Sequence, residues 1–209
     1  QFRKGITFKH LTASGDVINT YSLIGSNAAI VALIECEDKY LATSEQSSIS
    51  EPKEMLMGHP NNNFEIGYEK YSDELAMTEF VPIGETVQDW SQMITIQSLI
   101  GYRPETLESF ATRFTQLVID DCSGSDQEII WSDVQYGYNS LLLAINCQEN
   151  LNTGLPERIL VKAIQGDEAL YVVQKAWKYD PKDGELADWF YELESFIVCG
   201  KNNDYEMCT

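Results

Sequence analysis

Basic residues and histidines are scarce in this chain. Lysine and arginine together number 14 against 33 aspartate and glutamate residues, which gives a formal net charge of −19 at pH 7. A field of this sign repels nucleic acids and anionic lipid surfaces unless a local basic patch overrides it. No run of the sequence gathers more than two basic residues. Nucleic-acid binding is therefore disfavoured, and the acidic composition favours a soluble, monomeric protein.

Long apolar runs and nucleotide-binding motifs are also missing. The longest apolar runs, 28–34 and 141–145, are strand-sized and fall well short of the roughly 18 residues that a transmembrane helix needs. Neither G-x-G-x-x-G nor G-x-x-x-x-G-K-[ST] occurs, so no phosphate-cradling loop is predicted. With two widely separated histidines and no H-E-x-x-H or C-x-x-C spacing, the sequence predicts no metal site and no cofactor.

Five cysteines are present, and their placement permits disulfides. Cys122 follows an apparent helix and Cys147 ends an apparent strand, so a bridge between two elements is plausible. Cys199 and Cys208 flank a polar loop that a second bridge could close, which leaves Cys36 over. Disulfides indicate an oxidising compartment. Reduced thiols in the cytosol are the alternative interpretation.

Changes in composition divide the chain into three parts. Residues 1–42 are rich in β-branched and aromatic residues with glycine punctuation, which predicts an N-terminal β-rich segment. Residues 43–63 are polar and include two prolines and an asparagine run, which predicts a linker or long loop. Residues 64–209 form the predicted α+β domain.

Within that domain, two long amphipathic helices and seven strands are predicted. Apolar residues recur with helical spacing over 105–119, where Pro104 suits the first turn, and again over 183–198. The segments between and before them read as strands joined by short turns, which favours antiparallel pairing. We therefore expect an antiparallel β-sheet with two long amphipathic helices packed on one face, plus the N-terminal β-rich extension.

The segment 77–97 predicts a strand, a Pro-Gly corner, a short capped helix and a second strand. Proline cannot donate to a ladder and glycine tolerates the turn, so the first strand ends there. A capping box is predicted at the start of the short helix, and its tryptophan is predicted to pack on the sheet. These residues are interpreted as structural: Glu79, Pro82, Gly84, Glu85, Thr86, Asp89 and Trp90. A catalytic carboxylate pair within this set is the alternative interpretation.

Aromatic side chains provide the candidate ligand-binding residues, because no complete catalytic constellation is found. They are Tyr102 beside Arg103, and Tyr136 and Tyr138 around a glycine. The alternative is that these tyrosines are half-buried strand aromatics.

The motif E-[FY]-V-P-x-G-E-x-V-x-x-W, here Glu79 to Trp90, resembles a family of uncharacterised secreted or periplasmic proteins of gammaproteobacteria. That family includes type II secretion substrates. The resemblance covers roughly residues 63–199, and it implies export, a Cys122–Cys147 disulfide and a sheet-with-helices fold. It implies no catalytic mechanism.

The leading hypothesis is an exported bacterial protein, such as a type II secreted effector, that acts as a binding module and not as an enzyme. Its partner would be a protein, a small molecule or a lipid. One alternative is a hydrolase that uses acidic residues. The other is a lipid-headgroup-binding protein whose basic cluster would be assembled from Lys70, Arg103, Arg113 and Lys162.

Overall fold

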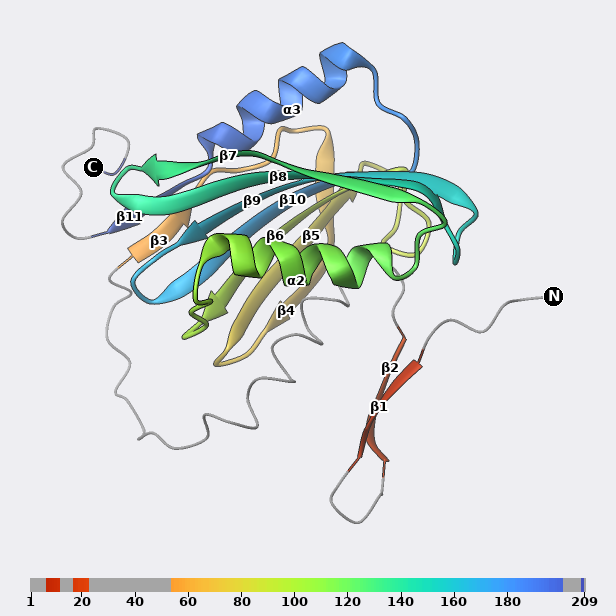
Figure 1. Ribbon diagram of the computed structural model, residues 1–209, viewed down its shortest axis with the longest axis horizontal. Coiled ribbons are helices and arrows are strands. Elements are labelled where there is room, and N and C mark those ends of the chain that lie inside the picture. The colour runs from red at the N-terminus through yellow and green to blue at the C-terminus, as the bar shows by residue number, and fades with distance from the viewer. Residues whose placement is uncertain (1–6, 12–16, 23–53, 201–207, 209) are drawn as a thin grey trace.

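The computed structural model describes residues 7–11, 17–22, 54–200 and 208 (Figure 1). Strands β1 (Thr7–Leu11) and β2 (Val17–Ser22) form an antiparallel hairpin. This hairpin is the described portion of the predicted segment 1–42. The remainder of that segment, including Cys36, lies outside the described residues.

Seven strands form one antiparallel sheet in the order β4-β5-β6-β10-β9-β8-β7. Short turns join most neighbouring strands, and only the β6–β10 pair joins strands that are distant in the sequence. The α+β class and the antiparallel sheet are thus confirmed. The strands are β4 (Phe64–Tyr71), β5 (Leu75–Pro82), β6 (Gln92–Ile100), β7 (Ser125–Gln135), β8 (Tyr138–Asn150), β9 (Leu155–Gln165) and β10 (Ala169–Trp177).

The two helices of the described domain pack on opposite faces of this sheet (Figure 1). Helix α2 (Leu107–Ile119) buries its apolar stripe against one face, and α3 (Asp183–Ser195) packs on the other. The prediction that both helices share one face is therefore wrong. The physical reason is visible in β8, where consecutive leucines point to alternate faces. Leu141 and Leu143 lie in the core under α2, whereas Leu142 lies in the core under α3, so both faces need a cover.

Local chemistry sets the start of α2. The Thr106 hydroxyl accepts a hydrogen bond from the Ser109 amide at 3.0 Å, and the Ser109 hydroxyl accepts one from the Thr106 amide at 3.2 Å. This reciprocal capping box satisfies amides that the helix leaves without partners. The helix therefore begins at Leu107, two residues later than the sequence pattern predicts.

Helix α3 is shorter than predicted because its apolar pattern continues into a strand. The helix ends at Ser195, and the following residues form β11 (Ile197–Gly200). Strand β11 pairs with β3 (Glu54–Met57), which falls inside the predicted linker 43–63. The prediction of a loop is thus wrong for residues 54–57, and residues 43–53 lie outside the described residues.

Glu54 fixes this small two-stranded sheet to the end of the large one. Its buried carboxylate accepts hydrogen bonds from the amides of Asp167 and Glu168, both at 2.7 Å, in the turn between β9 and β10. The Tyr171 hydroxyl donates to the same carboxylate at 3.3 Å. Several hydrogen bonds thus converge on one buried carboxylate, and they hold β3 in place by its first residue.

The Pro-Gly corner contains no helix, contrary to the prediction. Residues 83–91 form turns and bends, although the Thr86 hydroxyl does accept the Asp89 amide at 3.2 Å. The Glu85 carboxylate accepts hydrogen bonds from the Ser91 amide and hydroxyl at 2.5 and 2.6 Å. These bonds join the two ends of the segment 85–91. Trp90 is 7% exposed and belongs to the core on the α2 face.

Two disulfides join the cysteine pairs that the sequence favours. Cys122–Cys147 links the end of α2 to β8, and Cys199–Cys208 links β11 to the described residue near the chain's end. The first bridge fastens α2 to the sheet at the helix end opposite its capping box.

Candidate functional site

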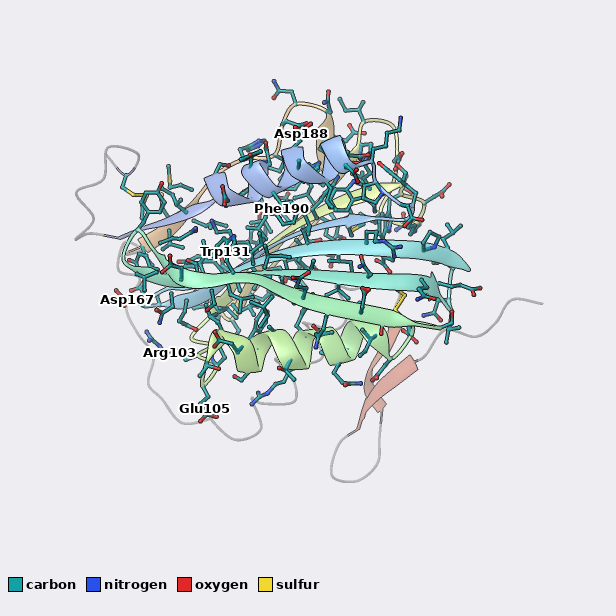
Figure 2. The ribbon with its side chains drawn as sticks, turned by 45° about the horizontal axis from the view of Figure 1, so that its top comes forward. Arg103, Glu105, Trp131, Asp167, Asp188 and Phe190 are labelled. Atoms are coloured by element: carbon teal, nitrogen blue, oxygen red, sulfur yellow. A yellow bond between two sulfur atoms is a disulfide. The ribbon has the colours of Figure 1, made fainter. Side chains whose placement is uncertain are left out.

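A cleft of about 420 Å³ opens at the first turn of α2, between that helix and the ends of β7, β8 and β9. Its lining comprises residues 104–108, Ser132, Asp133, Val134, Asn139 and Gln165. The helix side comes from the segment that caps α2, and the sheet side comes from the β7–β8 hairpin and its neighbour β9. Figure 2 shows Glu105 and Arg103 beside this end of α2.

The polar lining of the cleft is dominated by hydrogen-bond acceptors. Glu105 and Glu108 contribute carboxylates from the start of α2, and no lysine, arginine or histidine lies among the lining residues. Asp133 also lines the cleft, but its side chain alternates to the other face of the sheet and its Oδ1 accepts the Val134 amide at 2.7 Å. The Gln165 Oε1 atom is buried and has no hydrogen-bond partner among the described residues. A ligand that donates hydrogen bonds or carries positive charge would therefore complement this cleft.

Glu108 connects the two walls of the cleft. Its carboxylate accepts a hydrogen bond from the Ser132 hydroxyl at 2.8 Å. This hydrogen bond, together with one from its own backbone amide, holds the pKa of Glu108 below its ordinary value. The carboxylate is thus ionised at neutral pH, as a cation-binding group must be and a general acid must not.

The predicted ligand-binding residues border the cleft without lining it. Tyr102 and Arg103 immediately precede the lining segment, and Tyr102 packs against the core under α2. Tyr136 forms the β7–β8 turn with φ of 52°, and Gly137 with φ of 87° completes it, as tight hairpins require. Tyr138 faces the other side of the sheet, where it packs near Val198. The four predicted residues therefore lie near the cleft or on the other face of the sheet, and none of them is among its lining residues.

The residues that line the cleft were not predicted, because the sequence pattern around them is only weakly indicative of a site. The acidic and hydroxyl residues from Glu105 to Ser109 indicate a helix start, and a helix start alone does not predict a cleft. Ser132, 24 positions away, meets Glu108 only in the folded chain.

The motif residues at the Pro-Gly corner differ in burial and in their hydrogen-bond contacts. Glu79 is buried on β5 at 8% exposure. Glu85 is occupied by the Ser91 amide and hydroxyl, and Asp89 is exposed. Pro82 ends β5 and Gly84 adopts φ of 90° in the turn that follows. Their geometry fits a folded corner.

Two lysines are buried under α3, although lysine is a residue type that is usually exposed. Lys162 donates to the carbonyl oxygens of Glu194 and Phe196 at 3.1 and 2.8 Å, where the end of α3 carries partial negative charge. Lys175 donates to Gln92 Oε1 at 2.6 Å, and its Nζ lies 4.3 Å from the ring centroids of both Phe64 and Trp189.

Burial lowers the pKa of Lys162 to about 8 and that of Lys175 to about 7. Both side chains are fully buried, so neither faces a ligand from solvent. Lys162 therefore cannot belong to the surface basic cluster that a lipid-headgroup site would need. Arg113 lies on α2, on the opposite side of the sheet from Lys162.

Among the described residues, no group of three or more His, Cys, Asp or Glu side chains could hold a metal ion. No helix in the described part of the chain is long and apolar enough to cross a membrane.

Comparison with known proteins identifies no family. No protein-family model matches the chain, and no curated protein matches it. The chain is similar to a solved structure of a mutant of the protein Mog1, with 14% identity and a TM-score of 0.41, over 66% of this chain and 78% of that one. It is also similar to PsbP (CyanoP) from Synechocystis, with 13% identity and a TM-score of 0.41, over 74% and 98% of the two chains.

A third similar structure is LpqN of Mycobacterium tuberculosis, described as involved in cell envelope biogenesis, with 14% identity and a TM-score of 0.36 over 69% and 90% of the chains. Similarity at this level assigns neither a family nor a function.

Proposed function

We propose that this protein is an exported, non-catalytic binding module whose ligand carries positive charge and binds in the cleft at the start of α2. The observation that carries the proposal is the lining of that cleft: the carboxylates of Glu105 and Glu108, the buried Gln165 Oε1 atom, and no basic residue. The ligand group that fits is an ammonium or a guanidinium, because either can donate several hydrogen bonds to carboxylate and amide oxygens.

The charge of the whole chain supports the same ligand class. A net charge of −19 attracts cationic partners over a distance set by the ionic strength. It would accelerate their encounter with the protein, and the cleft would supply the specific contacts. Each solvent-exposed ion pair contributes only about 0–1 kcal/mol, so a single small cation would bind weakly and several contacts would be needed for tight binding.

The chemistry of the cleft favours binding over hydrolysis. A general acid needs a pKa raised toward neutrality, whereas the pKa of Glu108 is lowered. Glu157, whose pKa is raised by burial, lies on β9 opposite Cys147 at the other end of α2. The carboxylate whose pKa is raised therefore lies away from the cleft.

Export is part of the proposal and is supported by the two disulfides, because such bonds form and persist in oxidising compartments. The resemblance of the segment Glu79 to Trp90 to exported gammaproteobacterial proteins points the same way. A type II secreted effector is one protein of this kind.

The cleft can be tested with blocked amino acids as probes. We expect N-acetyl-arginine amide and N-acetyl-lysine amide to shift the backbone amide resonances of residues 105–109 and 132–139 in an NMR titration, and N-acetyl-glutamate amide to leave them in place. Binding should weaken as sodium chloride is raised, because salt screens exposed charges.

The matched variants separate the cleft from the general acidity of the protein. Glu105→Gln/Glu108→Gln removes two charges from the cleft, and Asp188→Asn/Glu69→Gln removes two from α3 and β4. The first variant should lose most of the response to N-acetyl-arginine amide and the second should keep it. Equal losses in both, or no shifts in the wild type, would contradict the proposal.

A further inference from the structure

Strand β7 is a long edge of the large sheet, and it borders the cleft. Among the described strands it pairs only with β8, so its outer side presents backbone N–H and C=O groups that no described strand takes up. Such an edge is a template for an additional strand. Ser132, Asp133 and Val134 of β7 also line the cleft, which places the mouth of the cleft at this edge.

The side chains of β7 are unusual for an edge strand that faces water. Ile129, Ile130 and Val134 are 42%, 39% and 59% exposed. The pairing register with β8 shifts between Ile129 and Trp131, so Ile130 is the additional residue of a β-bulge. Three exposed aliphatic side chains on one edge provide apolar contact for an extended partner chain.

The charge of β7 indicates which kind of chain could pair with this edge. Strand β7 carries Asp126, Glu128 and Asp133 and has no basic residue. A second copy paired with β7 would place like charges across the new ladder, which is destabilising. An extended segment that carries lysine or arginine would place opposite charges there.

We propose that β7 binds an extended, lysine- or arginine-bearing segment of another protein as an added strand of the sheet. This inference rests on the proposed function, because one basic side chain of the added segment enters the cleft. Ser132 and Val134 pair with Leu141 and Asn139 and so lie on the α2 face of the sheet. Side chains on the same face of an added strand would lie beside them and extend toward Glu105 and Glu108.

The backbone of the added strand would supply hydrogen bonds, and alternate side chains would supply specificity. Strand addition and cation binding can therefore be tested separately. Binding of a cation in the cleft requires no strand, whereas strand addition requires backbone amides in the partner.

The probe is a blocked peptide of alternating lysine and threonine, about nine residues long, which spans about 30 Å when extended. We expect it to bind at least ten times more tightly than N-acetyl-lysine amide. We also expect it to slow hydrogen exchange of β7 amides and to give contacts between peptide and β7 backbone protons in NMR spectra. The β4 edge, Phe64–Tyr71, is the internal control and should show no protection.

Two control peptides decide the outcome. One carries N-methyl groups on alternate residues and keeps every lysine, and the other has glutamate in place of lysine. We expect both to lose the added affinity. If the N-methylated peptide binds like the parent, strand addition is wrong and the proposed cation site stands. If protection appears on β4, the inference about β7 is wrong. If the glutamate peptide binds equally, both proposals fail.

Discussion

Lys175 lies wholly inside the protein with its Nζ 4.3 Å from the centroid of the Trp189 indole ring. The lysine comes from β10 and the tryptophan from α3, so this contact fastens the helix to the central strand of the sheet. Phe64 on β4 lies at the same distance from Nζ, and the Gln92 side chain accepts its one described hydrogen bond. The aromatic rings around Nζ stabilise the charged form of Lys175. Burial of the side chain destabilises that charged form.

Stability should therefore rise with pH above neutrality. Burial lowers the pKa of Lys175 from 10.5 to about 7, although the carboxylates of Glu185 and Glu85 oppose that shift. Between those two pH values the unfolded chain binds more protons than the folded one, so the free energy of unfolding increases with pH. From pH 7 to 9 this one group should contribute a gain of about 2 kcal/mol.

The variant Lys175→Met should lose that part of the pH dependence, because methionine fills similar space without a titrating group. Urea unfolding at pH 7, 8 and 9 measures the slope, and Lys182→Met at the exposed start of α3 is the control. Lys162, with a pKa of about 8, adds a slope of the same sign in every variant. Identical slopes for wild type and Lys175→Met would show that Lys175 is charged in the folded protein.

Glu157 predicts a pH dependence of opposite sign at lower pH. Burial raises its pKa above 4.5, while a hydrogen bond from Asn150 at 2.9 Å and the charge of Lys178 oppose the shift. The folded state then holds a proton that the unfolded state releases, so stability falls as pH rises from 4.5 toward the folded pKa.

The Glu157→Gln variant should be more stable than wild type at pH 7, by a margin that shrinks as pH falls toward 4.5. Thermal or urea unfolding across this range gives the comparison, and the exposed Glu149→Gln is the matched control on β8. A constant difference between wild type and Glu157→Gln at all pH values would mean that Glu157 titrates normally.

The Cys122–Cys147 disulfide closes a loop of 25 residues. Replacing both cysteines with alanine should lower the free energy of unfolding by about 3–4 kcal/mol, because the unfolded chain regains conformational entropy. The same change at Cys199 and Cys208, which are 9 residues apart, should cost about 1 kcal/mol less.

Chemical denaturation of both double variants under non-reducing conditions measures these costs. A loss in the Cys199→Ala/Cys208→Ala variant that exceeds the loss in the other would contradict the loop-length argument. Mass spectrometry of non-reduced peptides provides the independent check that wild type carries both bridges.

Sequence periodicity was sufficient for the strands of the large sheet and for α2, because these elements follow local rules. Alternation and turn residues define β4, β5 and β6, and a complete apolar stripe defines α2. The placement of the helices on opposite faces was also encoded, in the unbroken apolar run Leu141–Ile145. A strand covered on one face only would alternate between apolar and polar residues.

Other features depend on contacts between distant parts of the chain. The apolar residues that follow α3 fit a helix and a strand equally well. Only the pairing of β11 with β3 makes them a strand. Lys162 and Lys175 lie inside apolar runs on central strands, and such runs indicate burial. Lysine itself is usually exposed, so the residue type alone predicts the opposite. The cleft could not be predicted because Glu108 and Ser132 meet only through the packing of α2 on the sheet.

The pairing of β3 with β11 also has a mechanical consequence. Glu54 lies opposite Gly200, so tension applied to the chain at these two residues pulls on the same end of one short ladder. The hydrogen bonds of an antiparallel pair run across the strands, and a force in that direction breaks them one after another. Stretched from these two points, the domain would lose the β3–β11 ladder and the contacts of Glu54 with the β9–β10 turn before the strands of the seven-stranded sheet separate.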